Sequence, residues 1–74
     1  MMIALKDAFE KINRRFTVGR VIEYRDFWVF GYSDERDCSP IAVKKETGET
    51  FSFFPPRYLG KDIGTPKVID ISTI

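Results

Sequence analysis

Residues 27–32 constrain this chain more than any other segment, because their sequence is Phe-Trp-Val-Phe-Gly-Tyr. Four of these six residues are aromatic, and aromatic side chains favour β-strands. The polar pair Arg25-Asp26 precedes them, and a segment rich in β-branched residues lies before that pair. Residues 27–32 are therefore predicted to form the central strand of a small sheet, and they place no nucleophile, general base or metal ligand.

The chain has 74 residues, so residues 1–74 are predicted to form a single small domain. A domain of this size buries only about 60% of the surface that its unfolded chain exposes. Seven Phe, three Tyr and one Trp must supply much of the core. Burial of one Phe contributes roughly 1.5–3 kcal/mol, so a few aromatic side chains decide whether the chain folds.

An N-terminal helix is predicted over residues 3–16. Its apolar residues follow the i, i+3, i+4, i+7 spacing of an amphipathic helix. They are Leu5, Ala8, Phe9, Ile12 and Phe16. Arg14 and Arg15 fall in the last turn, where cations suit the helix dipole.

Residues 18–24 and 27–32 are predicted to pair as a first hairpin. A three-residue loop places Tyr24 opposite Trp28 and Ile22 opposite Phe30, and this register gathers large side chains on one face. Residues 40–45 and 49–54 are predicted to form a second hairpin around the turn Glu46-Thr47-Gly48, with Gly48 in the left-handed conformation. The expected pairs are Lys45 with Glu49, Val43 with Phe51, and Ile41 with Phe53, while Lys44 and Thr50 share the other face.

The residues after the second hairpin are harder to place. Pro55-Pro56 stops the sheet, because proline cannot donate to a ladder. Residues 57–63 could form one short helical turn, and Val68, Ile69, Ile71 and Ile74 a last strand or a packed arm. The predicted fold is thus α+β, with an N-terminal helix packed on a four-stranded antiparallel sheet of two hairpins and a possible fifth element at the C-terminus.

Side chains alternate along a strand, so Trp28, Phe30 and Tyr32 share one face. This face is predicted to be buried under the helix, together with Ile41, Val43, Phe51 and Phe53. The opposite face carries Phe27, Val29 and Phe54 and has two open interpretations. It is either an exposed interaction patch or a surface covered by the tail through Ile69 and Ile71.

Several short motifs follow one another along the chain. They are Asp7-Ala8-Phe9 with Lys11, the alternating Trp28, Phe30 and Tyr32, then Ser39-Pro40-Ile41, Val43-Lys44 and Thr47-Gly48-Glu49. In this order residues 7–54 resemble the YrhB-like domains, a small bacterial family related to immunity proteins of polymorphic toxin systems. The resemblance implies protein binding rather than catalysis. After Phe54 the chain departs from the family, which has a short loop and a final helix, because Gly60 and Gly64 interrupt such a helix.

Charge and composition argue against several functions. Twelve basic and eleven acidic side chains leave a net charge of +1, which does not favour nucleic acid or an anionic membrane surface. The chain has no His, so Ser-His and Cys-His nucleophile pairs are absent. Cys38 lies in an acidic stretch that disfavours a thiolate, and this stretch lacks the spacing of a calcium loop. We therefore expect no enzyme activity, metal or cofactor.

The expected compartment is the cytoplasm, because a single Cys makes no internal disulfide and no secretory or membrane-spanning run is found. The first functional hypothesis is a non-enzymatic protein-binding domain of the immunity type. Its predicted partner-binding residues are Phe27, Val29, Asp34, Glu35, Arg36, Asp37 and Phe54. An acidic loop over residues 34–37 suits a basic partner. The alternatives are a self-associating structural domain that forms a homodimer and, third, a small enzyme that works without His.

Overall fold

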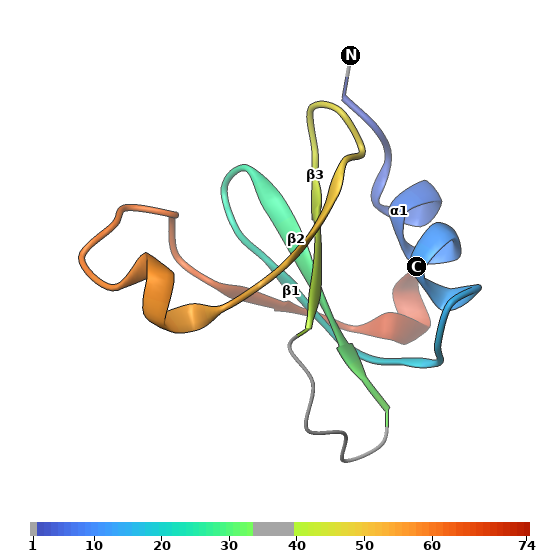
Figure 1. The fold of residues 1–74 in the computed structure, drawn as a ribbon. Helices are drawn as coiled ribbons and strands as arrows, with labels where there is room; N and C mark the ends of the chain where they lie inside the picture. The colour runs from blue at the N-terminus through green and yellow to red at the C-terminus, as the bar shows by residue number, and fades with distance from the viewer. Residues whose placement is uncertain (1, 34–39) are drawn as a thin grey trace.

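The computed structural model describes residues 2–33 and 40–74. One N-terminal helix lies beside an antiparallel sheet of five strands in the order β4-β3-β2-β1-β5. Figure 1 shows α1 on one side of the sheet. The elements are α1 (Leu5–Asn13), β1 (Val18–Glu23), β2 (Phe27–Tyr32), β3 (Ile41–Lys44), β4 (Thr50–Ser52) and β5 (Lys67–Ile69), with short 3₁₀ turns η1 (Pro55–Tyr58) and η2 (Ile71–Thr73). The predicted α+β class is confirmed, and the fifth element is an edge strand beside β1.

Helix α1 is shorter than the predicted range of residues 3–16. Ala4 has an extended backbone, and the Ile3 amide donates to the Lys45 carbonyl at 2.8 Å, so the chain before Leu5 lies along the end of β3. At the other end the Val18 amide donates to Asn13 Oδ1 at 3.2 Å. Lys11 Nζ also donates to the Gly48 carbonyl at 3.1 Å, which ties the helix to the β3–β4 turn.

The first core cluster lies between α1 and the sheet. Phe30 and Ile12 are fully buried in it, and the Phe9 ring lies 6.4 Å from the Phe30 ring. The buried members are Ala8, Ile12, Val18, Val21, Trp28, Phe30 and Val43. The prediction that Trp28 and Phe30 pack under the helix is confirmed, and Tyr32 extends this face with its ring 4.1 Å from that of Phe16.

The predicted register of the first hairpin is wrong by one residue. The structure pairs Val21 with Phe30, Ile22 with Val29 and Glu23 with Trp28. The reason is a two-residue turn at Arg25-Asp26, closed by the Tyr24 amide donating to the Phe27 carbonyl at 2.9 Å. Ile22 and Tyr24 therefore lie on the face away from the helix.

The predicted register of the second hairpin is also wrong by one residue. The pairs are Ile41 with Ser52, Ala42 with Phe51 and Val43 with Thr50. Residues 45–48 form a four-residue turn, because the Lys44 amide donates to the Glu49 carbonyl at 2.9 Å and the Gly48 amide to the Lys44 carbonyl at 2.8 Å. Gly48 has the expected left-handed backbone, with φ of 76°.

This shift moves two phenylalanines through the sheet. Phe51 and Phe53 lie on the face opposite to α1, whereas the expected contacts were with the helix. Lys44 and Thr50 lie on opposite faces, not on a shared one.

The face away from α1 carries a second core cluster. Its buried members are Phe27, Val29, Ala42 and Phe53, and the hydrophobic side chains packed against them are Ile22, Tyr24, Phe51, Tyr58 and Ile63. Figure 1 shows residues 55–63 in orange on this side of the sheet, and η2 beside α1 on the other. We call residues 55–63 the covering segment.

The expected exposed patch is therefore wrong for two of its three residues. Phe27 is 7% exposed and Val29 is 3% exposed, while Phe54 is 50% exposed. The interpretation that the tail covers this face is right, but not through the residues expected. Ile69 and Ile71 pack against the first cluster, on the helix side.

Candidate binding groove

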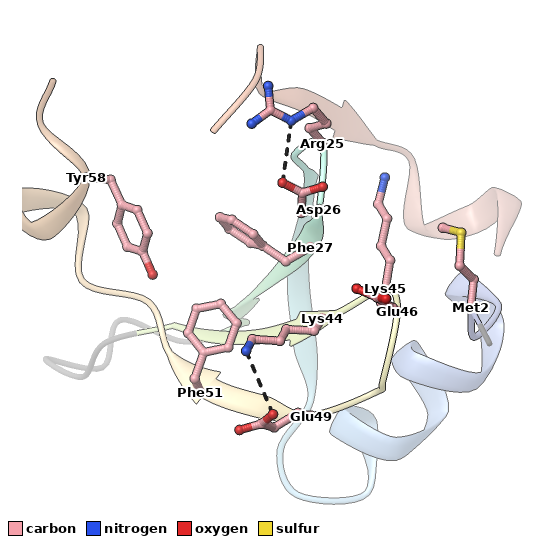
Figure 2. A pocket seen from close by; sticks show the side chains of 10 residues that line it. All are labelled: Met2, Arg25, Asp26, Phe27, Lys44, Lys45, Glu46, Glu49, Phe51 and Tyr58. Atoms are coloured by element: carbon pink, nitrogen blue, oxygen red, sulfur yellow. Dashed lines mark hydrogen bonds and ion pairs between the residues drawn. The ribbon is translucent and has the colours of Figure 1, made fainter. Parts of the chain in front are cut away.

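A hollow of about 810 Å³ opens on the sheet face away from α1 and reaches Met2 and Lys45 at the end of the sheet. Figure 2 shows the side chains around it. The hollow forms where the β1–β2 turn, the β3–β4 hairpin and the covering segment meet. The lining residues are Met2, Arg25, Asp26, Phe27, Lys44, Lys45, Glu46, Glu49, Phe51 and Tyr58. We call this surface the aromatic groove.

Three aromatic rings give the groove its apolar surface. The Phe27 ring lies 5.5 Å from that of Phe51, edge to face, and 6.0 Å from that of Tyr58. Figure 2 shows the rings of Tyr58 and Phe51 beside that of Phe27, with Tyr58 to its left and Phe51 below it. Tyr58 also stacks on Phe53 at 5.1 Å, which fixes the orientation of its ring.

Charged side chains of both signs surround these rings. Lys44 Nζ lies 3.8 Å from Glu49 Oε2, and Arg25 Nε lies 3.4 Å from Asp26 Oδ2. All four side chains are more than half exposed. Exposed ion pairs of this kind contribute only about 0–1 kcal/mol, so their charges can re-pair with a bound molecule at little cost.

Arg25 holds the C-terminal end of the covering segment against the β1–β2 turn. Its Nη2 donates to the Asp62 carbonyl at 2.8 Å, its Nη1 donates to Asp62 Oδ2 at 3.2 Å, and its amide donates to the Ile63 carbonyl at 3.2 Å. The Arg25 hydrogen bond holds the pKa of Asp62 below its usual value, and the Gly64 amide adds to this effect. These contacts keep the wall of the groove beside its floor.

Gly64 is required at this point for two reasons. Its φ of +89° lies in the region that favours glycine, and a Cβ there would lie 2.9 Å from the Arg25 Cβ. The close approach lets the backbone of residues 62–64 run along the turn.

A second ion pair fixes Lys45 at the edge of the groove. Lys45 Nζ donates to Glu23 Oε2 at 2.9 Å, and the two side chains are 14% and 33% exposed. The Lys45 hydrogen bond lowers the pKa of Glu23, against the opposing effect of burial. Trp28 also lowers the pKa of Glu23, but by less than Lys45 does. Its Nε1 is buried and has no hydrogen-bond partner among the described residues.

Lys45 also lines a smaller depression of about 390 Å³ next to the aromatic groove. The other residues around it are Glu23, Tyr24, Arg25, Gly64, Thr65 and Lys67. Arg25 and Lys45 line both hollows, and both side chains already make ion pairs. We treat the larger hollow, the aromatic groove, as the candidate site.

The residues predicted from sequence are placed as follows. Phe27 lines the groove, Val29 is buried beside it in the second cluster, and Phe54 is exposed outside the lining. Asp34, Glu35, Arg36 and Asp37 lie outside the described residues, as does Cys38. Sequence reasoning missed Lys44, Glu49, Phe51 and Tyr58 as members of one site, because the predicted register put Phe51 under the helix.

The groove offers apolar contact and exchangeable charges. In residues 2–33 and 40–74 no group of three or more Cys, Asp or Glu side chains is arranged to hold a metal ion. No helix within these same ranges has the length and apolar character needed to cross a membrane. An aromatic floor with a charged rim suits the binding of an apolar side chain within a polar surface.

Comparisons of this chain with protein-family models, with curated proteins and with solved structures give no match. What the chain does must therefore be inferred from the groove and its surroundings.

Proposed function

We propose that this chain is a non-enzymatic protein-binding domain that takes an apolar side chain of its partner into the aromatic groove. The observation that carries this proposal is the hollow lined by the rings of Phe27, Phe51 and Tyr58. Aromatic pockets that exclude water around one inserted side chain supply much of the energy of protein interfaces. The walls are held by ring stacking and by Arg25, so little order has to be gained on binding.

The rim favours a partner surface that carries charge of both signs. Lys44 and Glu49 are 52% and 66% exposed, and their 3.8 Å contact is long enough to exchange for new ion pairs. The acidic residues Asp34, Glu35 and Asp37 belong to the same proposal, because their negative charge would speed encounter with a basic region of the partner.

The resemblance to YrhB-like domains adds a finer proposal. The partner is then a bacterial toxin, and binding inhibits the toxin by covering its surface. Action in the cytoplasm belongs with this proposal, since a chain with a single Cys has no internal disulfide framework.

Photo-cross-linking at the rim tests the binding proposal. Lys44 is replaced by p-benzoylphenylalanine, and the exposed Lys6 of α1 is replaced in the same way as a matched control on the other side of the sheet. Light is applied to the cells that produce the protein, and cross-linked products are identified by mass spectrometry. We expect a specific product from position 44 and none from position 6. The same abundant proteins at both positions would contradict the proposal.

Three groove variants test whether the captured protein binds in the groove. Tyr58→Ala removes one wall and is expected to weaken binding more than tenfold, whereas Tyr58→Phe keeps the ring and is expected to bind nearly normally. The double exchange Lys44→Glu with Glu49→Lys keeps an ion pair but reverses the charges on the rim. Unchanged binding in Tyr58→Ala would show that the partner uses another surface.

Growth measurements test the immunity part separately. The captured protein is expressed alone and then together with this chain. Growth arrest relieved by the wild type but not by Tyr58→Ala is expected for an immunity protein. A captured protein that binds through the groove without harming growth would leave the binding proposal standing and remove the immunity proposal.

A further inference from the structure

The sheet has two edges, and their outward-facing backbone groups can be assigned from the ladder. In β4 the Glu49 carbonyl accepts from Lys44, and the Phe53 amide donates to the Pro40 carbonyl at 2.8 Å. Alternate residues of an antiparallel strand pair with the same neighbour, so the amides of Thr50, Ser52 and Phe54 point away from β3. Within the described ranges, no turn or loop hydrogen bond engages the backbone of Thr50 or Ser52.

The other edge, β5, is protected in the way that natural sheets protect their edges. Its pairing with β1 turns the backbone of Val68 outward. Pro66 lacks an amide donor and Lys67 carries a charge, and both features discourage the addition of a further strand. Asp70 then caps η2 and ends the strand, since its Oδ1 accepts from the Ser72 amide at 3.0 Å.

The β4 edge has no such protection. Residues 50–54 read Thr-Phe-Ser-Phe-Phe, without a charge or a proline before Pro55. Phe54 is 50% exposed and keeps an extended backbone, with φ of −117° and ψ of 99°. Three outward amides on an uncharged edge strand with an exposed Phe54 form a template for an added strand.

We propose that two copies of this chain pair through β4, antiparallel and about a two-fold axis at Ser52. Outward-facing residues form the hydrogen-bonded pairs of such a ladder. Ser52 then pairs with Ser52 of the second copy. The Phe54 amide donates to the Thr50 carbonyl of the second copy, while the Phe54 carbonyl keeps its hydrogen bond from the Arg57 amide at 3.0 Å. Phe51 lies opposite Phe53 of the second copy on the face that carries the groove. This surface is a strand edge that meets the groove at Phe51, and pairing with a second copy goes beyond the proposed function.

The strand fits a second copy of itself because this register brings no like charges together. The nearest charged residue, Glu49, lies opposite Pro55 of the second copy, where proline ends the ladder. The half-buried Phe51 gains an aromatic neighbour, and cross-strand aromatic pairs stabilise sheets. The small Ser52 side chains at the axis allow close approach.

The dimer should be weak. A ladder of five residues buries far less than the roughly 1,000 Å² of a stable interface. We therefore expect a Kd on the order of 0.1–1 mM, with dissociation on dilution.

Dilution of the unmodified protein followed by ¹⁵N NMR tests this inference. Over concentrations below and above the expected Kd, the amide resonances of Thr50, Ser52 and Phe54 should move, and that of Val68 should not. Resonances that do not depend on concentration, or that move at Val68 instead, would overturn the proposed dimer.

Matched substitutions at the two edges give a second measurement. Ser52→Lys places two cations opposite each other at the axis and should abolish association in sedimentation, while Val68→Lys at the β5 edge should leave it unchanged. In a Cys38→Ser background, Ser52→Cys should oxidise to a disulfide-linked dimer at least tenfold faster than Val68→Cys, since hydrogen-bonded pairs have Cα atoms about 5.5 Å apart. Equal rates, or association that survives Ser52→Lys, would overturn the β4 interface.

Discussion

Lys45 Nζ lies 2.9 Å from Glu23 Oε2 and 5.4 Å from the centre of the Trp28 ring. The pair links the end of β3 to the end of β1 across the indole of the central strand. Lys45 is therefore held by a carboxylate and by the face of an aromatic ring.

This ion pair predicts a pH-dependent contribution to stability. The pKa of Glu23 is lowered in the folded state, so the contribution is present above the unfolded pKa of about 4.3 and is lost as the pH falls through the lower folded pKa. Glu23→Gln is expected to reduce the free energy of unfolding by about 0.5–1 kcal/mol at pH 7. The difference should vanish well below pH 4, as measured by urea unfolding with Trp28 fluorescence.

Glu46→Gln is the matched control for this measurement. Glu46 is exposed on the rim of the groove, so its substitution should change the free energy of unfolding by less than about 0.5 kcal/mol at either pH. A deficit of Glu23→Gln that has the same size at both pH values would contradict a role through charge.

Arg25→Ala is expected to loosen the chain beside the groove without unfolding the sheet. The substitution removes the guanidinium donors to Asp62 at 2.8 Å and 3.2 Å but keeps the amide that donates to Ile63. Hydrogen exchange of the amides of residues 61–64 should accelerate, while the amides of β2 stay protected. Arg14→Ala, at the exposed end of α1, is the control and should leave exchange in residues 61–64 unchanged.

Two glycines in the tail separate a backbone effect from a steric one. Gly60 and Gly64 have similar φ values of +79° and +89°, but a Cβ at Gly60 meets nothing within 4 Å, whereas one at Gly64 meets Arg25 at 2.9 Å. Gly60→Ala should destabilise by about 1–2 kcal/mol through its backbone alone. Gly64→Ala should destabilise by clearly more, measured by urea unfolding. Equal losses would mean that Arg25 moves aside freely.

The sequence predicted the elements of this fold better than their registers. The run of aromatic residues placed β2 at its observed bounds, and the amphipathic spacing placed the helix and its buried face. Both hairpins were shifted by one residue, because turn length decides the register and neither Arg25-Asp26 nor residues 45–48 contain the Asn-Gly type of turn that fixes it.

The neighbouring residues did not correct that shift. Val21 and Ile22 are both apolar, so the pattern of β1 fits either face of the sheet. The same holds at Phe53-Phe54, where one ring is buried and the next is half exposed. The groove could not be predicted because it needs Tyr58, which the covering segment brings over the sheet through contacts distant in sequence.

Phe53 and Phe54 offer the sharpest test of the observed register. Phe53 is 6% exposed, and its ring lies within 6 Å of the rings of Tyr24, Phe27 and Tyr58, at 5.6 Å, 5.8 Å and 5.1 Å. Phe53→Ala should cost about 3–5 kcal/mol, which approaches the whole stability of a small domain. Phe54→Ala, one residue later and half exposed, should cost less than about 1 kcal/mol.

Because the loss expected for Phe53→Ala approaches the whole stability of the domain, Phe53→Leu provides a graded version of the same test. It keeps most of the buried volume and should cost less than about 1.5 kcal/mol, within the range of urea unfolding. The Tyr58 ring stacks on Phe53, so the substitution should also loosen the covering segment. Amide hydrogen exchange should therefore accelerate more in residues 55–63 than in α1. Greater loosening of α1 than of residues 55–63 would instead place Phe53 under the helix, as the register predicted from the sequence requires.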